Sequence, residues 1–269
     1  MMSEKITILD GGFGTMLQLA GLPPGKDPLD WNLENPQEVV RIHREYREAG
    51  AEIISANTFG ANELKYAGAH DLETLVRLGV ENAREALGGN GGKVALDLGP
   101  TGRMLKPAGD LDFIDAYEAF SRTVRVGVGA GADLVFIETM GDLRELKAAV
   151  LAAKDNCDLP VYASVALQSD GKLLTGADIE CVSVLLESLQ VDALGLNCGV
   201  GPDKMLSAVE RLSAISARPI IVKPNAGLPR VIDGRTVFTV DPETFAGHVV
   251  KLAEAGAAYI GGCCGTTPD

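Results

Sequence analysis

Aromatic residues and histidines are scarce in this sequence: 5% of its 269 residues are aromatic, one is tryptophan and three are histidine. The chain also has no segment rich in lysine and arginine, and its formal net charge is −13. A surface that binds nucleic acid needs clustered basic residues. The composition therefore argues against DNA or RNA as a partner.

Long apolar segments are lacking as well. No run approaches the roughly 18 apolar residues of a membrane-spanning helix, and the start, Met1–Lys5, does not lead into a signal peptide. We therefore expect a cytoplasmic protein with no membrane partner. Five cysteines do not suggest the disulfide framework of a secreted protein. In a reducing compartment, clustered cysteines indicate metal binding or catalysis instead.

One pattern recurs along the chain: a short apolar segment ends in small or polar residues, and an amphipathic stretch follows. Such apolar runs are typical of parallel strands buried on both faces, and the intervening lengths suit crossover helices. The predicted strands are Ile6–Asp10, Glu52–Asn57, Val94–Gly99, Leu134–Glu138, Val161–Leu167, Ala193–Cys198, Ile220–Asn225 and Ala258–Cys263. These segments predict an α/β fold, the (β/α)8 TIM barrel.

An open doubly wound sheet is the alternative fold, although Gly11–Gly14 is not a complete dinucleotide-binding motif. No linker or low-complexity tract divides the chain, so we expect one domain over residues 1–269. The sequence ends at Asp269, directly after the last predicted strand. We therefore expect a barrel without its final helix, whose uncovered apolar face belongs to a longer protein or meets a partner.

Three stretches have the apolar spacing of amphipathic helices. The residues predicted to face the core are Val39, Ile42 and Tyr46 in Pro36–Ala49, Met205, Val209 and Leu212 after Pro202, and Phe245, Val249 and Leu252 between Asp241 and Gly256. Asp241 is predicted to cap the last of these helices.

Three of the five cysteines lie at the carboxyl ends of predicted strands, where a TIM barrel forms its active site. Cys198 ends the sixth strand, and Cys263 and Cys264 end the eighth. Only one strand separates these two ends, so the thiols can share a metal ion. Zinc binds cysteine sulfurs tetrahedrally and keeps one position open in catalytic sites. Neighbouring cysteines on a strand point to opposite faces, but the flanking glycines permit backbone angles that turn both to one ion.

The spacing alone is equally compatible with buried cysteines that only pack in the core. A disulfide between Cys198 and one of the terminal pair is a further alternative, which a reducing compartment disfavours. Cys157 and Cys181 lie away from the strand ends and are expected to be buried structural residues.

Asp10 and Glu138 are the acidic residues best placed at strand ends. Their carboxylates could receive a substrate ammonium group, or each could cap the loop that follows it. The loop Gly11–Thr15 could offer backbone N–H groups to a substrate carboxylate, or form only a tight turn. Lys223 is the single strand-end lysine that could serve a lyase or aldolase, which is a minor alternative.

Six motifs together resemble the homocysteine S-methyltransferase family, in that family's order and across almost the whole chain. They are Asp10–Thr15, Asn57–Gly60, Gly99–Gly102, Ile137–Thr139, Asn197–Gly199 and Gly261–Pro268. The combination of Asn-Cys-Gly with Gly-Gly-Cys-Cys-Gly is the most specific part.

The resemblance implies a TIM barrel whose zinc is held by Cys198, Cys263 and Cys264, with no catalytic residue beyond the zinc site. It also implies that the two acids hold the amino group of homocysteine and that the glycine-rich loop meets its carboxylate. The implied substrate-binding residues are Asp10, Gly12, Phe13, Gly14, Thr15, Glu138 and Asn197.

The methyl donor varies within the family. Lys223–Pro229 resembles the cobalamin-dependent type, so we expect a methyl-corrinoid, on a partner protein or another domain, to methylate homocysteine and give methionine. S-methylmethionine, S-adenosylmethionine or betaine is an alternative donor, and a non-catalytic zinc-binding module of a larger assembly is the alternative to an enzyme. The loops Gly102–Asp110 and Gly227–Gly234 are the predicted docking surfaces for the corrinoid.

Overall fold

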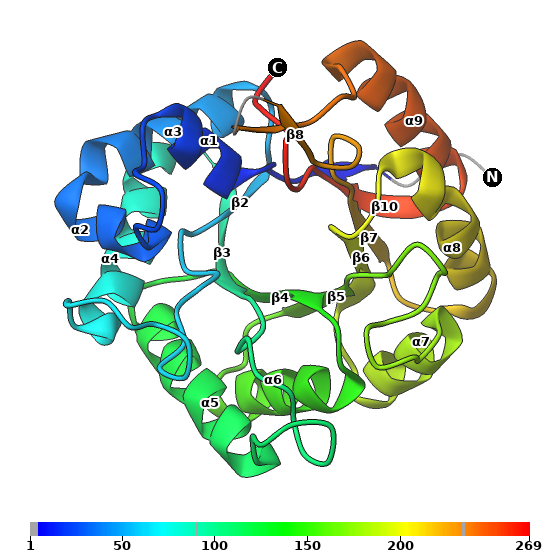
Figure 1. The fold of residues 1–269 in the computed structure, drawn as a ribbon, viewed down its shortest axis with the longest axis horizontal. Coiled ribbons are helices and arrows are strands. Elements are labelled where there is room, and N and C mark those ends of the chain that lie inside the picture. The colour runs from blue at the N-terminus through cyan, green and yellow to red at the C-terminus, as the bar shows by residue number, and fades with distance from the viewer. Residues whose placement is uncertain (1–4, 90, 233–234) are drawn as a thin grey trace.

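The computed structural model describes residues 5–89, 91–232 and 235–269. Within them, eight parallel strands form a barrel inside a ring of helices (Figure 1). The barrel strands are β1 (Thr7–Ile8), β2 (Ile53–Ser55), β3 (Lys93–Leu98), β4 (Leu134–Met140), β5 (Val161–Val165), β6 (Ala193–Asn197), β7 (Ile220–Lys223) and β10 (Ala257–Ile260). Their order around the sheet is β1-β10-β7-β6-β5-β4-β3-β2.

The barrel closes between its first two strands. Leu9 and Ile53 form a parallel bridge, and hydrogen bonds run from Glu52 N to Ile8 O (2.7 Å) and from Asp10 N to Ile53 O (3.1 Å). The predicted TIM barrel is confirmed, and the open doubly wound sheet is wrong. Because β1 also pairs with β10, the loops that follow the first and last strands lie side by side.

Nine α-helices surround the barrel in the described part of the chain. They are α1 (Phe13–Leu19), α2 (Trp31–Glu34), α3 (Pro36–Glu48), α4 (Leu72–Leu87), α5 (Phe113–Gly129), α6 (Leu143–Asn156), α7 (Ile179–Ser188), α8 (Pro202–Ile215) and α9 (Pro242–Glu254), with a 3-10 helix, η1, at Pro28–Asp30. The predicted core faces of α3 and α8 are buried. Over the ranges described, none of these helices has the length and apolar character that a bilayer crossing requires.

Helix α9 is less buried than its spacing predicts. Asp241 caps it as expected, accepting a hydrogen bond from Thr244 N (2.9 Å), and Leu252 is buried. Phe245 and Val249 are only half-buried, because they line a cavity of about 620 Å³ between α9 and α3, over β1. The residues that follow β10, Gly265–Asp269, line the same cavity.

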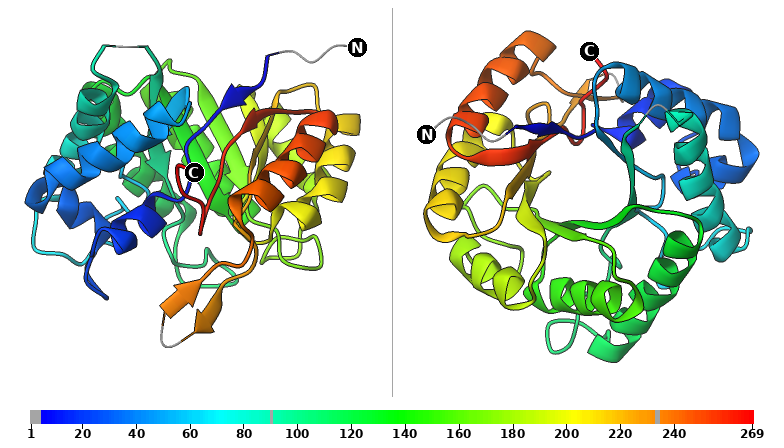
Figure 2. Two further views of the ribbon diagram at one scale, coloured as in Figure 1. Left: turned by 90° about the horizontal axis from the view of Figure 1, so that it is seen from above. Right: turned by 180° about the vertical axis from the view of Figure 1, so that it is seen from behind.

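A short hairpin after β7 was not predicted. It consists of antiparallel strands β8 (Arg230–Ile232) and β9 (Arg235–Val237). The hairpin projects beyond the carboxyl ends of the barrel strands (Figure 2). It therefore stands at the face of the barrel where the candidate site residues gather.

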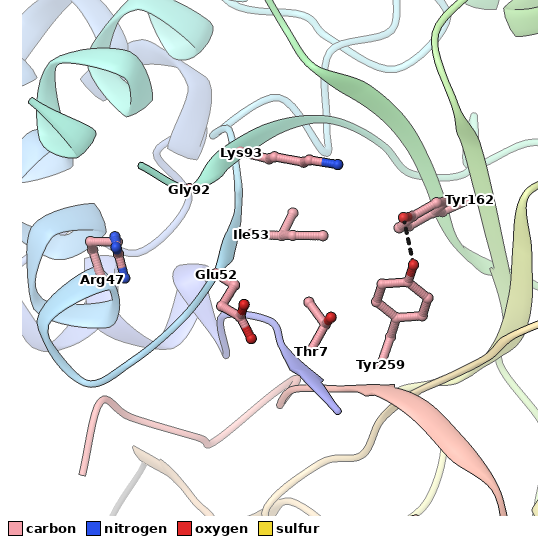
Figure 3. Close-up of a pocket in the computed structure, with 8 residues that line it drawn as sticks. All are labelled: Thr7, Arg47, Glu52, Ile53, Gly92, Lys93, Tyr162 and Tyr259. Atoms are coloured by element: carbon pink, nitrogen blue, oxygen red, sulfur yellow. Dashed lines mark hydrogen bonds between the residues drawn. The ribbon is translucent and has the colours of Figure 1, made fainter. Parts of the chain in front are cut away.

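The amino ends of the strands carry a different set of side chains. Tyr162 of β5 and Tyr259 of β10 have ring centroids 5.0 Å apart and hydroxyl oxygens joined by a hydrogen bond of 2.9 Å. They border a cavity of about 380 Å³ that Thr7, Glu52 and Lys93 also line (Figure 3). At the amino end of the barrel, the two tyrosine hydroxyl groups therefore bond to each other.

Candidate active site

Three cysteine thiols gather at the carboxyl ends of β6 and β10. The Sγ atoms of Cys198, Cys263 and Cys264 lie within 4.8 Å of one another, and those of Cys198 and Cys264 are 4.0 Å apart. Sulfurs bound tetrahedrally to zinc at about 2.3 Å are separated by about 3.8 Å. The cluster therefore fits one zinc ion with little adjustment. All three cysteines are free thiols rather than disulfide partners.

Strand β7 fixes the backbone of both cysteine segments. Cys198 N donates to Lys223 O (3.0 Å), and Cys264 N donates to Asn225 Oδ1 (3.1 Å). Cys198 has a φ of 56°, a left-handed conformation that is uncommon for a residue with a side chain. The turn directs its thiol towards the terminal pair instead of continuing β6.

Hydrogen bonding among the thiols moves their pKa values in opposite directions. Contacts from Cys263 and Cys264 lower the pKa of Cys198 to about 2. The same contacts with Cys198 raise the pKa of Cys264 to about 11 and hold that of Cys263 well above its usual range. Three thiolates in this space repel one another unless a cation lies between them. An all-sulfur donor set of this geometry suits zinc.

A second cluster, at the ends of β1, β4 and β7, is ionic. Lys223 Nζ lies 3.2 Å from Asp10 Oδ1 and 3.2 Å from Glu138 Oε2. Burial raises the pKa of Glu138, an effect that Lys223 opposes. Asp10 also accepts hydrogen bonds from Ser55 N (2.6 Å) and Ser55 Oγ (3.1 Å). Its carboxylate thus binds the neighbouring strand rather than capping its own loop.

Asn197 connects the two clusters. Its Oδ1 accepts hydrogen bonds from Thr139 N (2.7 Å) and Ser164 Oγ (2.7 Å), and its Nδ2 donates to Thr139 Oγ1 (2.6 Å). Thr139 follows Glu138 directly and has a φ of 65°, where the β4–β5 register shifts. Asn197 therefore stabilises a strained turn beside the ionic cluster. Its predicted contact with substrate stays a prediction.

The glycine-rich loop after β1 packs against the loop after β10. Gly12 N donates to Thr266 Oγ1 (2.9 Å), and Gly265 N donates to Thr15 Oγ1 (2.9 Å). A Cβ atom at Gly12 would lie 2.6 Å from Cys263 O. The close approach of the two loops therefore requires glycine at this position.

The same loop leads into α1. Phe13 begins the helix, and its ring stacks on buried His43 with centroids 4.4 Å apart. Gly14 and Thr15 belong to the first turn, whose N–H groups have no partner inside a helix. Such groups can bind a carboxylate. The predicted contact of this backbone with the carboxylate of the substrate stays a prediction.

Two charged residues of this cluster, Lys223 and Asp97, were not predicted to take part in substrate binding. Burial alone would lower the pKa of Lys223, but Glu138 and Asp10 hold it well above its usual range, unlike the lysine of a Schiff-base enzyme. Asp97 of β3 was not singled out, yet it is buried and electrostatically coupled to this cluster. A charged residue within an apolar strand is the signal that could have identified both.

The remaining two cysteines lie outside the site. Cys157 is half-buried after α6, but Cys181 is exposed on α7. The prediction of a buried structural role is therefore wrong for Cys181. Its neighbour Val182 faces the core instead.

The cluster of thiols and the buried ionic cluster place this protein among the TIM barrels whose catalytic face can hold a metal ion. The sequence matches the family described as homocysteine S-methyltransferase over residues 7–269. The chain is a member of this family, as the motifs predicted.

Two methionine synthases are similar to the chain over its full length. That of Mycobacterium tuberculosis (strain ATCC 25618 / H37Rv) is 34% identical over 291 residues, and that of Mycobacterium leprae (strain TN) is 32% identical over 291 residues. Each match covers 100% of this chain and 24% of the relative. The chain thus spans about a quarter of the length of these relatives.

The fold is also that of a solved enzyme, the homocysteine methyltransferase MmuM from Escherichia coli. Its metallated form has a TM-score of 0.83 and 26% identity, covering 99% of this chain and 94% of MmuM. The oxidised form gives a TM-score of 0.84 with the same identity and coverage.

Proposed function

We propose that this chain binds zinc through Cys198, Cys263 and Cys264 and methylates the thiol of homocysteine to give methionine. The observation that carries the proposal is the convergence of three thiols from two barrel strands beside a buried ionic cluster. Membership of the family and similarity to methionine synthases support the acceptor. The metallated form of MmuM supports a metal at the thiol cluster.

Cys198, Cys263 and Cys264 would hold the zinc ion, which would supply Lewis-acid chemistry that lowers the pKa of a substrate thiol. The protein would then need no separate base. The negative charges of the three cysteines would offset the charge of the metal, so the substrate sulfur would keep its nucleophilic character.

The residues around the thiols would orient the substrate. Glu138 would accept a hydrogen bond from the homocysteine ammonium group, with Asp10 behind it in the ionic cluster. Within the predicted Gly12–Thr15 loop, the N–H groups of Gly14 and Thr15 would donate to the carboxylate, because Gly12 N and Phe13 N already donate to Thr266 Oγ1 and Gly11 O. Asn197 would hold the backbone that follows Glu138. Holding the two charged groups on the α-carbon of the substrate limits the positions of its sulfur, which lowers the entropic part of the barrier.

For the methyl donor, we propose a methyl-corrinoid carried by another domain or by a partner protein. The sequence is 34% identical to a methionine synthase, compared with 26% for MmuM. The segment Lys223–Pro229, which resembles the cobalamin-dependent type, gives further support.

The experiment is a methyl-transfer assay with zinc-loaded protein and homocysteine. Methylcobalamin, S-methylmethionine, S-adenosylmethionine and betaine are offered in turn, and methionine is quantified. We expect methionine from methylcobalamin and none after zinc is removed. Methionine from another donor alone would reassign the donor. No product with any donor, together with a fourth protein ligand on the metal, would favour a non-catalytic zinc-binding module.

The loops after β3 and β7 are the proposed docking surface for the corrinoid carrier. They comprise Gly102–Asp110 and Gly227–Gly234, of which residues 233 and 234 lie outside the described residues. Charge reversal by Arg103→Glu or Arg230→Glu should slow transfer from a protein-bound methyl-corrinoid and leave transfer from free methylcobalamin unchanged. If both variants transfer methyl groups at the wild-type rate from the protein-bound donor as well as from free methylcobalamin, the docking proposal is contradicted.

A further inference from the structure

The ionic cluster contains more charge than a simple ammonium-binding site needs. Lys223 Nζ bridges Asp10 and Glu138 at 3.2 Å each and lies 3.5 Å from Ser55 Oγ. The ammonium group also sits 5.1 Å from the centre of the Phe136 ring, within range of a cation–π interaction. The exposed fractions of the Lys223, Asp10 and Glu138 side chains are 3%, 1% and 8%. The protein thus already places its own cation where both predicted substrate-binding acids meet.

The two acids differ in the acceptors they leave open. Asp10 uses Oδ2 for Ser55 N, and Oδ1 for Ser55 Oγ and Lys223 Nζ. Glu138 uses Oε2 for Lys223, and within the described ranges no protein donor contacts its Oε1. Glu138 is also the most exposed member of the cluster. The geometry therefore gives Glu138 the direct contact with a ligand and makes Asp10 a positioning residue.

Asp97 is a third acid close to these charges. It is buried, and its Oδ1 has no hydrogen-bond partner among the residues described. Burial, followed by repulsion from Glu138, raises the pKa of Asp97 well above its usual range. Among the described residues, the ion pairs of Lys223 are with Asp10 and Glu138 and not with Asp97, so two carboxylates face one lysine.

We propose that Lys223 is a positioning and specificity-determining residue, the internal counter-ion that leaves this pocket with one excess negative charge. The pocket therefore selects a thiol that carries one ammonium group. The identity of that thiol as homocysteine rests on the proposed function. Lys223 O also accepts the hydrogen bond from Cys198 N, so one residue sets the position of the acidic pocket relative to the metal-binding turn.

The test compares homocysteine with 4-mercaptobutanoate, which is the same molecule without its amino group. Binding of each thiol to zinc-loaded protein is measured by calorimetry, so no methyl donor is needed. The variants are Lys223→Met, Asp10→Asn and the double variant. Lys93→Met, at the opposite end of the barrel, is the matched control. Zinc content is measured for every protein.

Without Lys223, two buried carboxylates face each other, and one of them takes up a proton. Ser55 N and Ser55 Oγ still donate to Asp10, so the proton goes to Glu138, the acid that contacts the ligand. We expect Lys223→Met to weaken homocysteine binding about 30-fold or more, as for truncation of a buried charge pair, and to leave 4-mercaptobutanoate binding unchanged. Asp10→Asn neutralises the pocket and should also reduce the preference for homocysteine. The double variant restores one negative charge and should recover much of that preference.

Several results would overturn the inference. These are a wild-type protein that binds both thiols equally, an equal loss of both thiols in Lys223→Met, and a double variant no better than either single variant. Should Lys223→Met fail to fold, Asp10→Asn and the double variant decide the question between them. A wild-type protein that prefers homocysteine but forms no methionine contradicts the proposed reaction and supports the charge-based selection.

Discussion

The two ends of this barrel are built from the same strands and have opposite chemistry. At the amino end, Lys93 begins β3 as an exposed residue, and Tyr162 and Tyr259 satisfy each other's hydroxyl groups. At the carboxyl end, Lys223 finishes β7 in full burial between two carboxylates. A buried charge is costly unless it is paired and hydrogen-bonded. The comparison shows that the protein concentrates this cost at the face where the thiols lie, as is typical of functional sites.

The backbone follows this division only in part. Of the non-glycine residues with positive φ in the described ranges, Thr139 and Cys198 lie towards carboxyl strand ends, and Gln190 lies in the loop before β6. This conformation costs about 1–3 kcal/mol for a residue with a Cβ atom. Strain of this kind persists only where surrounding contacts fix it. Here Asn197 and the carbonyl oxygen of Lys223 provide those contacts.

The largest difference between the two ends of the barrel should appear when one thiol is removed. Cys263→Ser should lose bound zinc and methyl transfer together, because two thiolates cannot complete the three-sulfur set. Cys157→Ser, outside the cluster, should keep both. Zinc content by elemental analysis and methionine formation measure the outcome. An active, zinc-free Cys263→Ser protein would contradict the proposed metal site.

The next largest effect should come from Asn197→Ala. The substitution removes the three hydrogen bonds with Thr139 and Ser164, each contributing about 1 kcal/mol, so we expect a loss of about 3 kcal/mol in the free energy of unfolding. It also removes the contact of Asn197 Nδ2 with Cys263 Sγ (3.9 Å), so zinc affinity should fall as well. Denaturant unfolding and zinc titration measure the two effects. Wild-type values in both would mean that Asn197 does not stabilise this turn.

A third effect concerns His43, which packs behind the glycine-rich loop. Burial lowers its pKa from 6.5 to about 3, so below pH 6.5 the unfolded chain binds a proton that the folded chain does not. Stability from this residue is therefore present above pH 6.5 and is lost, by about 1.4 kcal/mol per pH unit, as the pH falls towards 3.

His43→Phe keeps an aromatic ring against Phe13 and should lessen this acid sensitivity. The measurement is the free energy of unfolding between pH 4 and 7, compared with Tyr162→Phe, whose pH dependence should parallel that of the wild type. Identical slopes in His43→Phe and the wild type would show that His43 does not titrate as its burial requires.

The smallest effect is expected at the amino end. Tyr162→Phe or Tyr259→Phe removes one hydrogen bond and should cost about 1 kcal/mol of stability, with zinc content and methyl transfer unchanged. Denaturant unfolding measures the stability, and elemental analysis and methionine formation measure zinc content and methyl transfer. A loss of zinc in either tyrosine variant would mean that the two ends of the barrel are not independent.

Much of the fold could be predicted because parallel barrel strands have a simple pattern. Apolar runs such as Leu134–Glu138 identify a buried strand, and the residues that end them identify the catalytic face. Strand order made the cysteine cluster possible, since only β7 separates β6 from β10, and the resemblance to the family favoured it over cysteines that only pack in the core.

The rest depends on contacts between residues distant in sequence. Two carboxylates at strand ends suggest a site for a substrate cation, but nothing local in the sequence indicates that Lys223 reaches both. The positive φ of Thr139 depends on a hydrogen bond that its N–H donates to Asn197, 58 positions away. Similarly, the spacing of Phe245 and Val249 predicts a buried face, and only the packing around α9 determines how much of it is covered.

The pairing of β1 with β10 has a consequence for how the protein matures. Gly12 and Thr266, 254 positions apart, meet beside the thiols, and two of the three cysteines belong to the segment after β10. During synthesis, a nascent chain that has emerged only as far as α9 carries Cys198 alone from this cluster. The proposed zinc ion would therefore bind only after β10 has paired with β1 and the barrel has closed.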